Sequence, residues 1–131
     1  ASYRRQRQMC IRDSQMSIQK IGEELKNTSQ LCRELKIDKK EFFGGSMTIS
    51  SLGGIGGTHF TPIINPPEVA ILGVGRTFDR LVKEKNQIVS RKILPISLSY
   101  DHRLIDGAEG ARFCVYLGKC LGKDFAFKLA V

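Results

Sequence analysis

The stretch that decides the fold is SLSYDHRLIDGAEGARF, residues 97–113. The run that ends inside it, residues 93–101, alternates apolar and polar side chains and predicts a β-strand. Beyond it, Asp106 is a typical helix N-cap, and Glu109 follows at capping-box spacing. We therefore expect His102 in the corner between a strand and a helix.

A histidine at such a corner has two possible roles, and the spacing alone leaves both open. An imidazole titrates near neutral pH, so a positioned His102 suits proton transfer. An isolated histidine at a corner is, however, more often a structural residue. Asp106 has the same ambiguity, because it can orient a neighbouring group or only cap the helix.

Outward from this corner, the pattern predicts a mixed α/β (α+β) fold with two helices. Apolar side chains recur near the 3.6-residue period from Ser17 to Leu35, which predicts an amphipathic helix. The second helix should end near Leu121, because Gly122 is a stop signal. Pro95 should lie near the start of its strand, since it lacks a ladder donor. The predicted strands are residues 46–52, 69–75, a hairpin in 76–92 with its turn near Lys85 and Asn86, and 93–101.

Length and composition exclude several classes of protein. A chain of 131 residues is about one domain, and 41% hydrophobic with 26% charged residues is ordinary for a soluble protein. No apolar run approaches the ~18 residues of a membrane span, and the N-terminus lacks the apolar core of a signal peptide. We therefore expect a cytoplasmic protein that does not contact a membrane.

Charge and metal-ligating residues narrow the choice of ligand. The net charge of +8 suits nucleic acid, a membrane surface or an anionic ligand. No aromatic side chains interleave with the basic ones and no predicted helix has a fully basic face. We therefore expect a phosphate-bearing small molecule and no nucleic acid. The four cysteines and two histidines lack metal-ligand spacing, so no metal site is expected.

A glycine-rich stretch, TISSLGGIGG at residues 48–57, is the second candidate site. Backbone N–H groups in such a loop can approach an oxyanion or a phosphate, although a plain connecting loop is the alternative. The stretch lacks Walker-loop and G-x-S-x-G spacing, which argues against nucleoside triphosphates and serine hydrolysis. His59 in the following loop is the rival histidine, with simple solvent exposure as its ordinary interpretation. The candidate residues of the stretch are Ser50, Ser51, Gly53 and Gly54.

Three segments together carry a family resemblance. They are GGSMTISSLGGIGG at 44–57, PIINPPEVAILGVG at 62–75 and LPISLSYDHRLIDGAEGARF at 94–113. In this order they resemble the C-terminal half of the dihydrolipoamide acyltransferase catalytic domain, the core subunit of 2-oxo acid dehydrogenase complexes. The family's H-x-x-x-D-G signature stands at 102–107. The resemblance implies a two-layer α/β sandwich like that of chloramphenicol acetyltransferase, truncated to its C-terminal half.

The resemblance also implies an activity. The sequence of these segments is most similar to the acetyltransferases of bacterial pyruvate dehydrogenase complexes, while 2-oxoglutarate succinyltransferases share part of the same sequence. An acetyl group would move between a dihydrolipoyl arm and coenzyme A. His102 would be the general base for the coenzyme A thiol, Ser50 would stabilise the oxyanion, and Asp106 would support the site. The residues expected along the coenzyme A and acyl channel are Ser51, Gly53 and Gly54.

In this family the active sites lie between the subunits of a homotrimer, and trimers build a larger core. His102 of one chain would then face Ser50 of its neighbour. Pyruvate dehydrogenase and dihydrolipoamide dehydrogenase subunits would be bound through domains that this sequence lacks, and the lipoyl group would be carried on another missing domain.

The sequence also departs from the family. The resemblance runs from Ser17 to Leu121, and the first half of the catalytic domain is missing. Residues 1–13 match nothing in the family, so 1–16 are expected to be a disordered or foreign tail and 17–131 the C-terminal half-domain. The ending KDFAFKLAV is also unusual. The alternative function is therefore a catalytically incomplete core fragment that only oligomerises.

Overall fold

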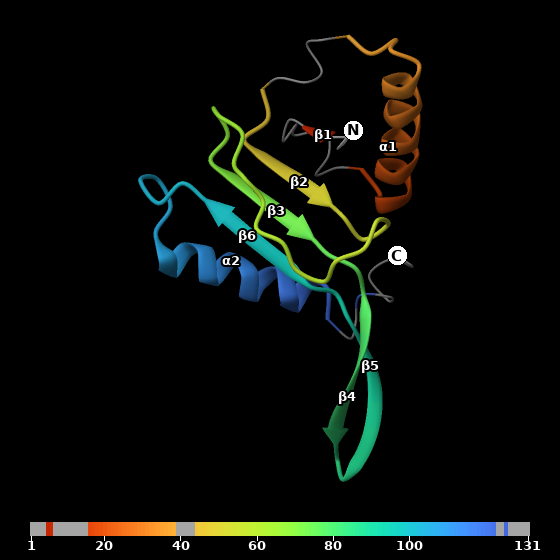
Figure 1. Ribbon diagram of the computed structural model, residues 1–131, viewed down its shortest axis with the longest axis vertical. Coiled ribbons are helices and arrows are strands. Elements are labelled where there is room, and N and C mark those ends of the chain that lie inside the picture. The colour runs from red at the N-terminus through yellow and green to blue at the C-terminus, as the bar shows by residue number, and fades with distance from the viewer. Residues whose placement is uncertain (1–4, 7–15, 39–43, 123–124, 126–131) are drawn as a thin grey trace.

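The computed structural model describes residues 5–6, 16–38, 44–122 and 125. Within these ranges it contains two helices and six strands (Figure 1). In chain order they are β1 (Arg5–Gln6), α1 (Ile18–Arg33), β2 (Met47–Ser51), β3 (Ala70–Val74), β4 (Phe78–Glu84), β5 (Gln87–Ile93), β6 (Ile96–Tyr100) and α2 (Gly107–Cys120). The mixed α/β class predicted from the sequence is confirmed.

The main sheet has the strand order β1-β2-β3-β6. Strand β3 pairs in parallel with β2 and antiparallel with β6, while the short β1 pairs antiparallel with β2. Helix α2 lies along β6, and α1 lies beyond the opposite edge of the sheet, near β1 and β2 (Figure 1). Strands β4 and β5 form a separate two-stranded hairpin that projects away from the sheet.

The local predictions from sequence are confirmed at the helix starts and at the hairpin. The Ser17 hydroxyl accepts a hydrogen bond from the backbone N–H of Lys20 at 3.3 Å and caps α1. Lys85 and Asn86 connect β4 to β5 with φ of 43° and 70°, as a tight hairpin turn requires. Pro95 directly precedes β6, where its missing N–H costs no ladder bond.

Two residues of the N-terminal tail pair with the main sheet. Arg5 and Gln6 form β1, with Arg5 opposite Ile49 and Gln6 opposite Thr48 of β2. This pairing is possible because the open edge of β2 offers backbone hydrogen-bonding groups to any extended segment, and the disordered or foreign tail expected at residues 1–16 stays a prediction. The remaining tail residues up to 15, and nearly all of the unusual ending, lie outside the described residues.

The core is small and centres on β3. Ala70, Ile71 and Leu72 are the buried hydrophobic residues, as expected for a strand with neighbours on both sides. Helix α1 has no buried residue, although its apolar residues recur along one face. The sheet therefore holds β3 in place, whereas α1 contributes little buried area.

No helix in the described ranges is long and apolar enough to cross a membrane.

One polar pair is buried beside this core. Thr48 on β2 is fully buried, and Glu68, just before β3, is 5% exposed. The Thr48 hydroxyl donates to Oε2 of Glu68, while Oε1 of the same carboxylate has no hydrogen-bond partner among the described residues. A buried carboxylate with a single partner is costly, so this one hydrogen bond matters for stability.

Replacing Thr48 by valine should lower the free energy of unfolding by about 1–3 kcal/mol, because Glu68 would lose its only hydroxyl donor in a buried place. Urea unfolding followed by circular dichroism measures the change. Thr77→Val, at an exposed threonine, is the matched control and should change stability little. Equal losses in the two variants would contradict the role given to the buried pair.

Candidate active site

The corner between β6 and α2 is tied together by the backbone of Asp101. Its N–H donates to the carbonyl of Val69 at 2.8 Å, which anchors the corner to the start of β3. Its carbonyl accepts from the N–H groups of Leu104 and Ile105, both at 3.0 Å. His102 lies inside this turn, so its backbone is held between anchors on either side.

The Asp101 side chain adds a second set of bonds to the same turn. Its Oδ1 accepts from the backbone N–H of Arg103 at 3.0 Å and from Nε of the guanidinium at 2.9 Å, and Oδ2 accepts from Nη2 at 2.6 Å. The Arg103 side-chain hydrogen bonds, with the backbone bond second, lower the pKa of Asp101 to about 2. The same pairing raises the pKa of Arg103. The pair is therefore ionised at any pH near neutrality.

The His102 ring is exposed and lies against Tyr100, with ring centroids 5.7 Å apart and planes tilted by 39°. Tyr100 in turn packs on α2, because a β-carbon at Gly110 would come within 2.8 Å of its Cε1. The imidazole is thus reachable from solvent, while its neighbours are fixed by the sheet and the helix.

Asp106 caps α2, as predicted. Its Oδ1 accepts from the backbone N–H of Glu109 at 2.7 Å. The Glu109 carboxylate points along the helix, where it lies 3.9 Å from the guanidinium of Arg112. Capping is therefore the contact that Asp106 makes in the described structure, and its predicted support of the site stays a prediction.

Ser50 lies far from His102 within one chain. It pairs with Gly73 on β3, and Gly73 pairs with Ser97 on β6, three residues before Tyr100. At ~3.3 Å per residue and ~4.8 Å between strands, the Ser50 and Tyr100 backbones are about 14 Å apart. His102 lies beyond Tyr100, so no side chain bridges this distance.

The side chains of Tyr100 and Ser50 also point to opposite faces of the sheet. Met47 and Ala70 share the row of Tyr100, on the face that α2 covers. Ser50 is three residues from Met47 and therefore points to the opposite face. There the ring of Phe60 covers Gly73, since a β-carbon at this glycine would lie 2.8 Å from it. One chain therefore does not bring the predicted base and oxyanion donor together.

Of the remaining candidates of the glycine-rich stretch, Ser51 ends β2, and Gly53 and Gly54 lie in the turn that follows. The N–H groups of Ile55 and Gly56 both donate to the carbonyl of Leu52 at 3.0 Å. Leu52 itself donates to Val74, which ties the turn to the end of β3. Three candidates differ in their surroundings: Ser51 and Gly54 are exposed, and Gly53 is half-buried against the Gly75 carbonyl. These bonds are those of a connecting turn, so a role in ligand binding stays a prediction.

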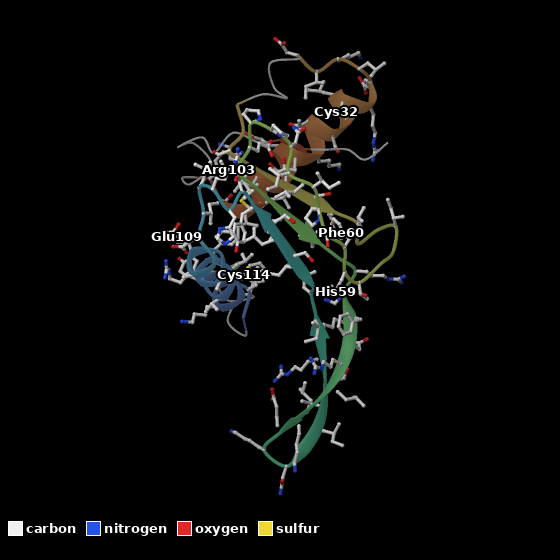
Figure 2. All side chains as sticks on the ribbon, turned by 60° about the vertical axis from the view of Figure 1, so that its left-hand side comes forward. Cys32, His59, Phe60, Arg103, Glu109 and Cys114 are labelled. Carbon is white, nitrogen blue, oxygen red and sulfur yellow. The ribbon has the colours of Figure 1, made fainter. Side chains whose placement is uncertain are left out.

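The rival histidine lies elsewhere. Figure 2 shows His59 near the base of the hairpin and Arg103 at the other end of β6. His59 is exposed, so solvent exposure describes it in this structure. Among the described residues there is also no cluster of three side chains suited to a metal ion.

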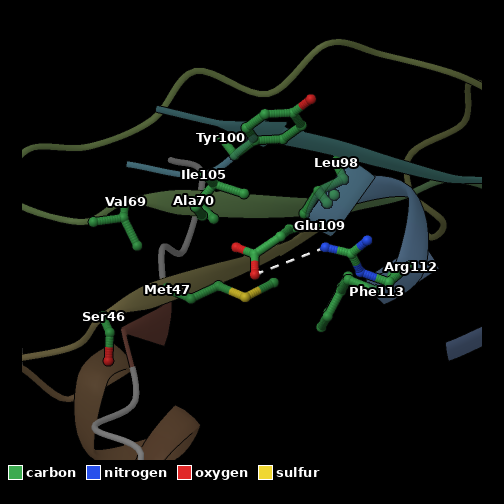
Figure 3. Close-up of a pocket in the computed structure, with 11 residues that line it drawn as sticks. Ser46, Met47, Val69, Ala70, Leu98, Tyr100, Ile105, Glu109, Arg112 and Phe113 are labelled. Atoms are coloured by element: carbon green, nitrogen blue, oxygen red, sulfur yellow. Dashed lines mark ion pairs between the residues drawn. The ribbon is translucent and has the colours of Figure 1, made fainter. Parts of the chain in front are cut away.

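A cavity that the sequence analysis missed lies between α2 and the sheet (Figure 3). Its volume is about 490 Å³. Apolar side chains including Met47, Leu98 and Phe113 line it, and the ion pair of Glu109 with Arg112 lies at its side. The alternation of β2 and β6 marks Met47 and Leu98, but only the packing of α2 with its Phe113 reveals the space. Neither His102 nor Ser50 lines this cavity.

Comparison with known proteins points to one family. The family model described as 2-oxoacid dehydrogenases acyltransferase (catalytic domain) matches residues 10–126. This match begins before Ser17, where the resemblance seen in the sequence began, so the expectation that residues 1–13 match nothing in the family is wrong for residues 10–13.

Two similar relatives are bacterial proteins named dihydrolipoyllysine-residue acetyltransferase component of pyruvate dehydrogenase complex. The Haemophilus influenzae protein is 54% identical over 101 residues, which is 77% of this chain and 18% of the relative. The Cupriavidus necator protein is 50% identical over 105 residues, which is 80% of this chain and 19% of the relative. The chain thus spans about a fifth of the length of these relatives.

Solved structures agree with this comparison. The dihydrolipoamide acetyltransferase of Azotobacter vinelandii superposes with a TM-score of 0.79 at 46% identity, covering 86% of this chain and 46% of that chain. The cubic core of a pyruvate dehydrogenase multienzyme complex gives the same TM-score at 45% identity and the same coverage. The expected acyltransferase fold is confirmed, over less than half of the solved chains.

The close packing of Tyr100 on α2 gives a prediction. Gly110→Ala should lower the free energy of unfolding by about 1–3 kcal/mol, because the new methyl group would collide with the ring. Gly118→Ala in the same helix is the control, since nothing lies within 4 Å of its β-carbon. It should be neutral or stabilise by up to about 1 kcal/mol. Urea unfolding measures the free energy of unfolding of both variants. Similar changes in the two would contradict the predicted collision with the Tyr100 ring.

The ion pair of Asp101 with Arg103 gives a pH dependence. Because the folded pKa of Asp101 is about 2 and that of an unfolded aspartate is ~3.9, its stabilisation is fully present above pH ~4. It is lost as the pH falls through 2. The difference in unfolding free energy between the wild type and Asp101→Asn should therefore shrink from pH 5 to pH 2.

The control for this titration is Asp79→Asn. Asp79 pairs with Lys92 at 3.5 Å, and both side chains are mostly exposed. Such pairs contribute little, so this variant should resemble the wild type throughout. A difference at Asp101 that stays constant down to pH 2 would contradict the assignment.

Proposed function

Because the chain belongs to the acyltransferase catalytic-domain family of the 2-oxoacid dehydrogenases, we propose that it carries part of an acetyltransferase active site. The reaction is transfer of an acetyl group between dihydrolipoamide and coenzyme A in a bacterial pyruvate dehydrogenase complex. Support comes from two relatives that share 54% and 50% identity with the chain and are named as acetyltransferase components of that complex.

The sequence spacing between Ser50, His102 and Asp106 supports the proposed active site. The Azotobacter vinelandii enzyme is described by the catalytic role of a serine, a histidine 52 positions later and an asparagine four positions after the histidine. In this chain Ser50 precedes His102 by 52 positions, and Asp106 follows it by four. Aspartate and asparagine are equally good N-caps, so capping of α2 is a role that both residues can fill.

The proposed mechanism uses His102 as general base. Its imidazole takes the proton of the coenzyme A thiol, whose pKa of about 8.5 leaves little thiolate at neutral pH. The sulfur forms a bond to the thioester carbonyl carbon, and the hydroxyl of Ser50 donates to the resulting oxyanion. The bond to the lipoyl sulfur then breaks, and the imidazolium returns its proton to that sulfur.

The site is proposed to lie between two chains of a homotrimer. Within one chain the Ser50 and Tyr100 backbones are about 14 Å apart, by the strand spacings. A neighbouring chain that supplies Ser50 to His102 would complete the site, and trimers would assemble into a larger core. A structure to which the chain is similar is the cubic core of such a complex.

Other binding roles are part of the same proposal. The turn that follows Ser50 would line the coenzyme A channel, with the phosphates of the ligand facing a chain of net charge +8. The lipoyl group, and the contacts with pyruvate dehydrogenase and dihydrolipoamide dehydrogenase subunits, would belong to other domains. The protein would act in the bacterial cytoplasm. The channel residues of the proposal are Ser51, Gly53 and Gly54.

The alternative is a core fragment that oligomerises without catalysis. It is favoured by the short coverage of the solved chains, 46%. It is also favoured by exposed apolar residues on α1, where Ile18 is 52% and Leu31 is 44% exposed. Trimers or larger bodies in light scattering, together with no acetyl transfer, would support this alternative.

His102→Ala should reduce transfer from acetyl-dihydrolipoamide to coenzyme A by roughly 10²–10⁴-fold, because the thiol loses its base. His59→Ala is the control and should transfer at the wild-type rate. Ser50→Ala should lower kcat by about 10²–10³-fold with little change in KM. Transfer that survives in His102→Ala rules out the base, and a change in KM alone makes Ser50 a binding residue.

Mixing the two inactive variants tests the position of the site between chains. In mixed trimers of His102→Ala and Ser50→Ala, one of the three interfaces joins an intact His102 to an intact Ser50. Random assembly at equal concentrations would therefore restore about a quarter of the wild-type sites. If both residues acted within one chain, no activity would return on mixing.

A further inference from the structure

One side chain holds the backbone on both sides of His102. The Asp101 carboxylate accepts the backbone N–H of Arg103 at 3.0 Å and the guanidinium of the same residue at 2.6 to 3.1 Å. His102 stands between these two residues, so the carboxylate bridges the turn across it. The Asp101 N–H donates to the Val69 carbonyl, and the Asp101 carbonyl accepts from the N–H of Leu104, which attaches the bridge to the sheet and to the turn.

We propose that Asp101 is a positioning residue for His102, with Arg103 fixing the carboxylate in place. The proposal rests on the base function proposed for His102. A base must be held in a narrow range of positions, and disorder of the turn would scatter the imidazole over many of them. The clamp removes this freedom before any substrate binds, and it leaves the ring against Tyr100.

The geometry of the clamp favours an ionised carboxylate and an arginine in particular. A planar guanidinium bonds both carboxylate oxygens at once, which sets an angle as well as a distance. The Asp101 side chain is 20% exposed and that of Arg103 is 88% exposed. Burial therefore does not hold Arg103 in place, and its bonds to Asp101 do.

The Asp106 cap cannot replace this clamp. It bonds the N–H of Glu109 and so fixes the first turn of α2, on the far side of Leu104 and Ile105. No hydrogen bond of Asp106 in the described structure reaches residues 101–103. The helix start and the histidine are therefore held by different carboxylates.

A second fork of the same kind provides a matched control. On the hairpin, Arg91 donates from Nε and Nη2 to the two oxygens of Glu84 at 3.2 and 2.6 Å. This fork joins β4 to β5, well away from the corner of His102 (Figure 1). Removing the Glu84–Arg91 ion pair therefore breaks the same type of hydrogen bonds without changing the surroundings of His102.

The test is proton NMR of the full chain, which contains only two histidines. The His102 Cε1–H signal, assigned with His59→Gln, should show a ring-current shift from Tyr100. In Asp101→Asn and in Arg103→Gln we expect this shift to fall toward the value of a short peptide, with the His59 signal unchanged. Glu84→Gln should leave both signals in place. Arg103→Gln decides the question if Asp101→Asn does not fold.

A kinetic measurement separates positioning from binding. In active assemblies, Asp101→Asn and Arg103→Gln should lower kcat about 10- to 100-fold with KM for coenzyme A nearly unchanged. An unchanged His102 signal in both variants overturns the proposal, and a rise in KM alone makes Arg103 a ligand-binding residue instead. If the wild type shows no transfer, the proposed function fails, while the NMR result still decides whether Asp101 positions His102.

Discussion

The pairing of β3 with its two neighbours is the constraint on which the other features depend. This strand supplies all the buried hydrophobic residues in the described structure, and its register with β2 and β6 sets every distance across the sheet. Ser50 and Tyr100 lie on different rows and different faces because that register allows nothing else. Consecutive residues of β3 are buried on both faces, so a slip by one residue would move each side chain to the opposite face and disrupt the packing of Ala70, Ile71 and Leu72.

That constraint explains why one chain does not bring the proposed base and the proposed oxyanion donor together. The sheet places His102, the proposed base, just past one end of β6 and Ser50, the proposed hydroxyl donor, near the other end of β2. A second chain is the simplest source of the missing half of each site. The exposed apolar side chains of α1 and the isolated hairpin point in the same direction, because a two-stranded ribbon is at best marginally stable alone.

Sequence reasoning succeeded where the controlling interactions are local. The cap by Asp106 and the turn at Lys85 and Asn86 depend on residues at most three positions apart, and both were predicted. The start of α1 was also predicted near Ser17, although its role as the cap was not. The pairing of β1 with β2, the buried Thr48 bond and the cavity under α2 join segments far apart in the chain, so no local pattern marks them. The motif itself located His102, but its distance from Ser50 required the register.

Two aspartate side chains stabilise different parts of the corner at residues 101–106. The Asp106 side chain accepts one backbone N–H, that of Glu109, and so starts α2. Aspartate has this capping role in many proteins. Among the described residues, the Asp101 carboxylate instead accepts its hydrogen bonds from Arg103, across the exposed His102. The ion pair contributes to stability above pH ~4, and its bonds also cross the turn at His102, which supports the proposed positioning of the imidazole.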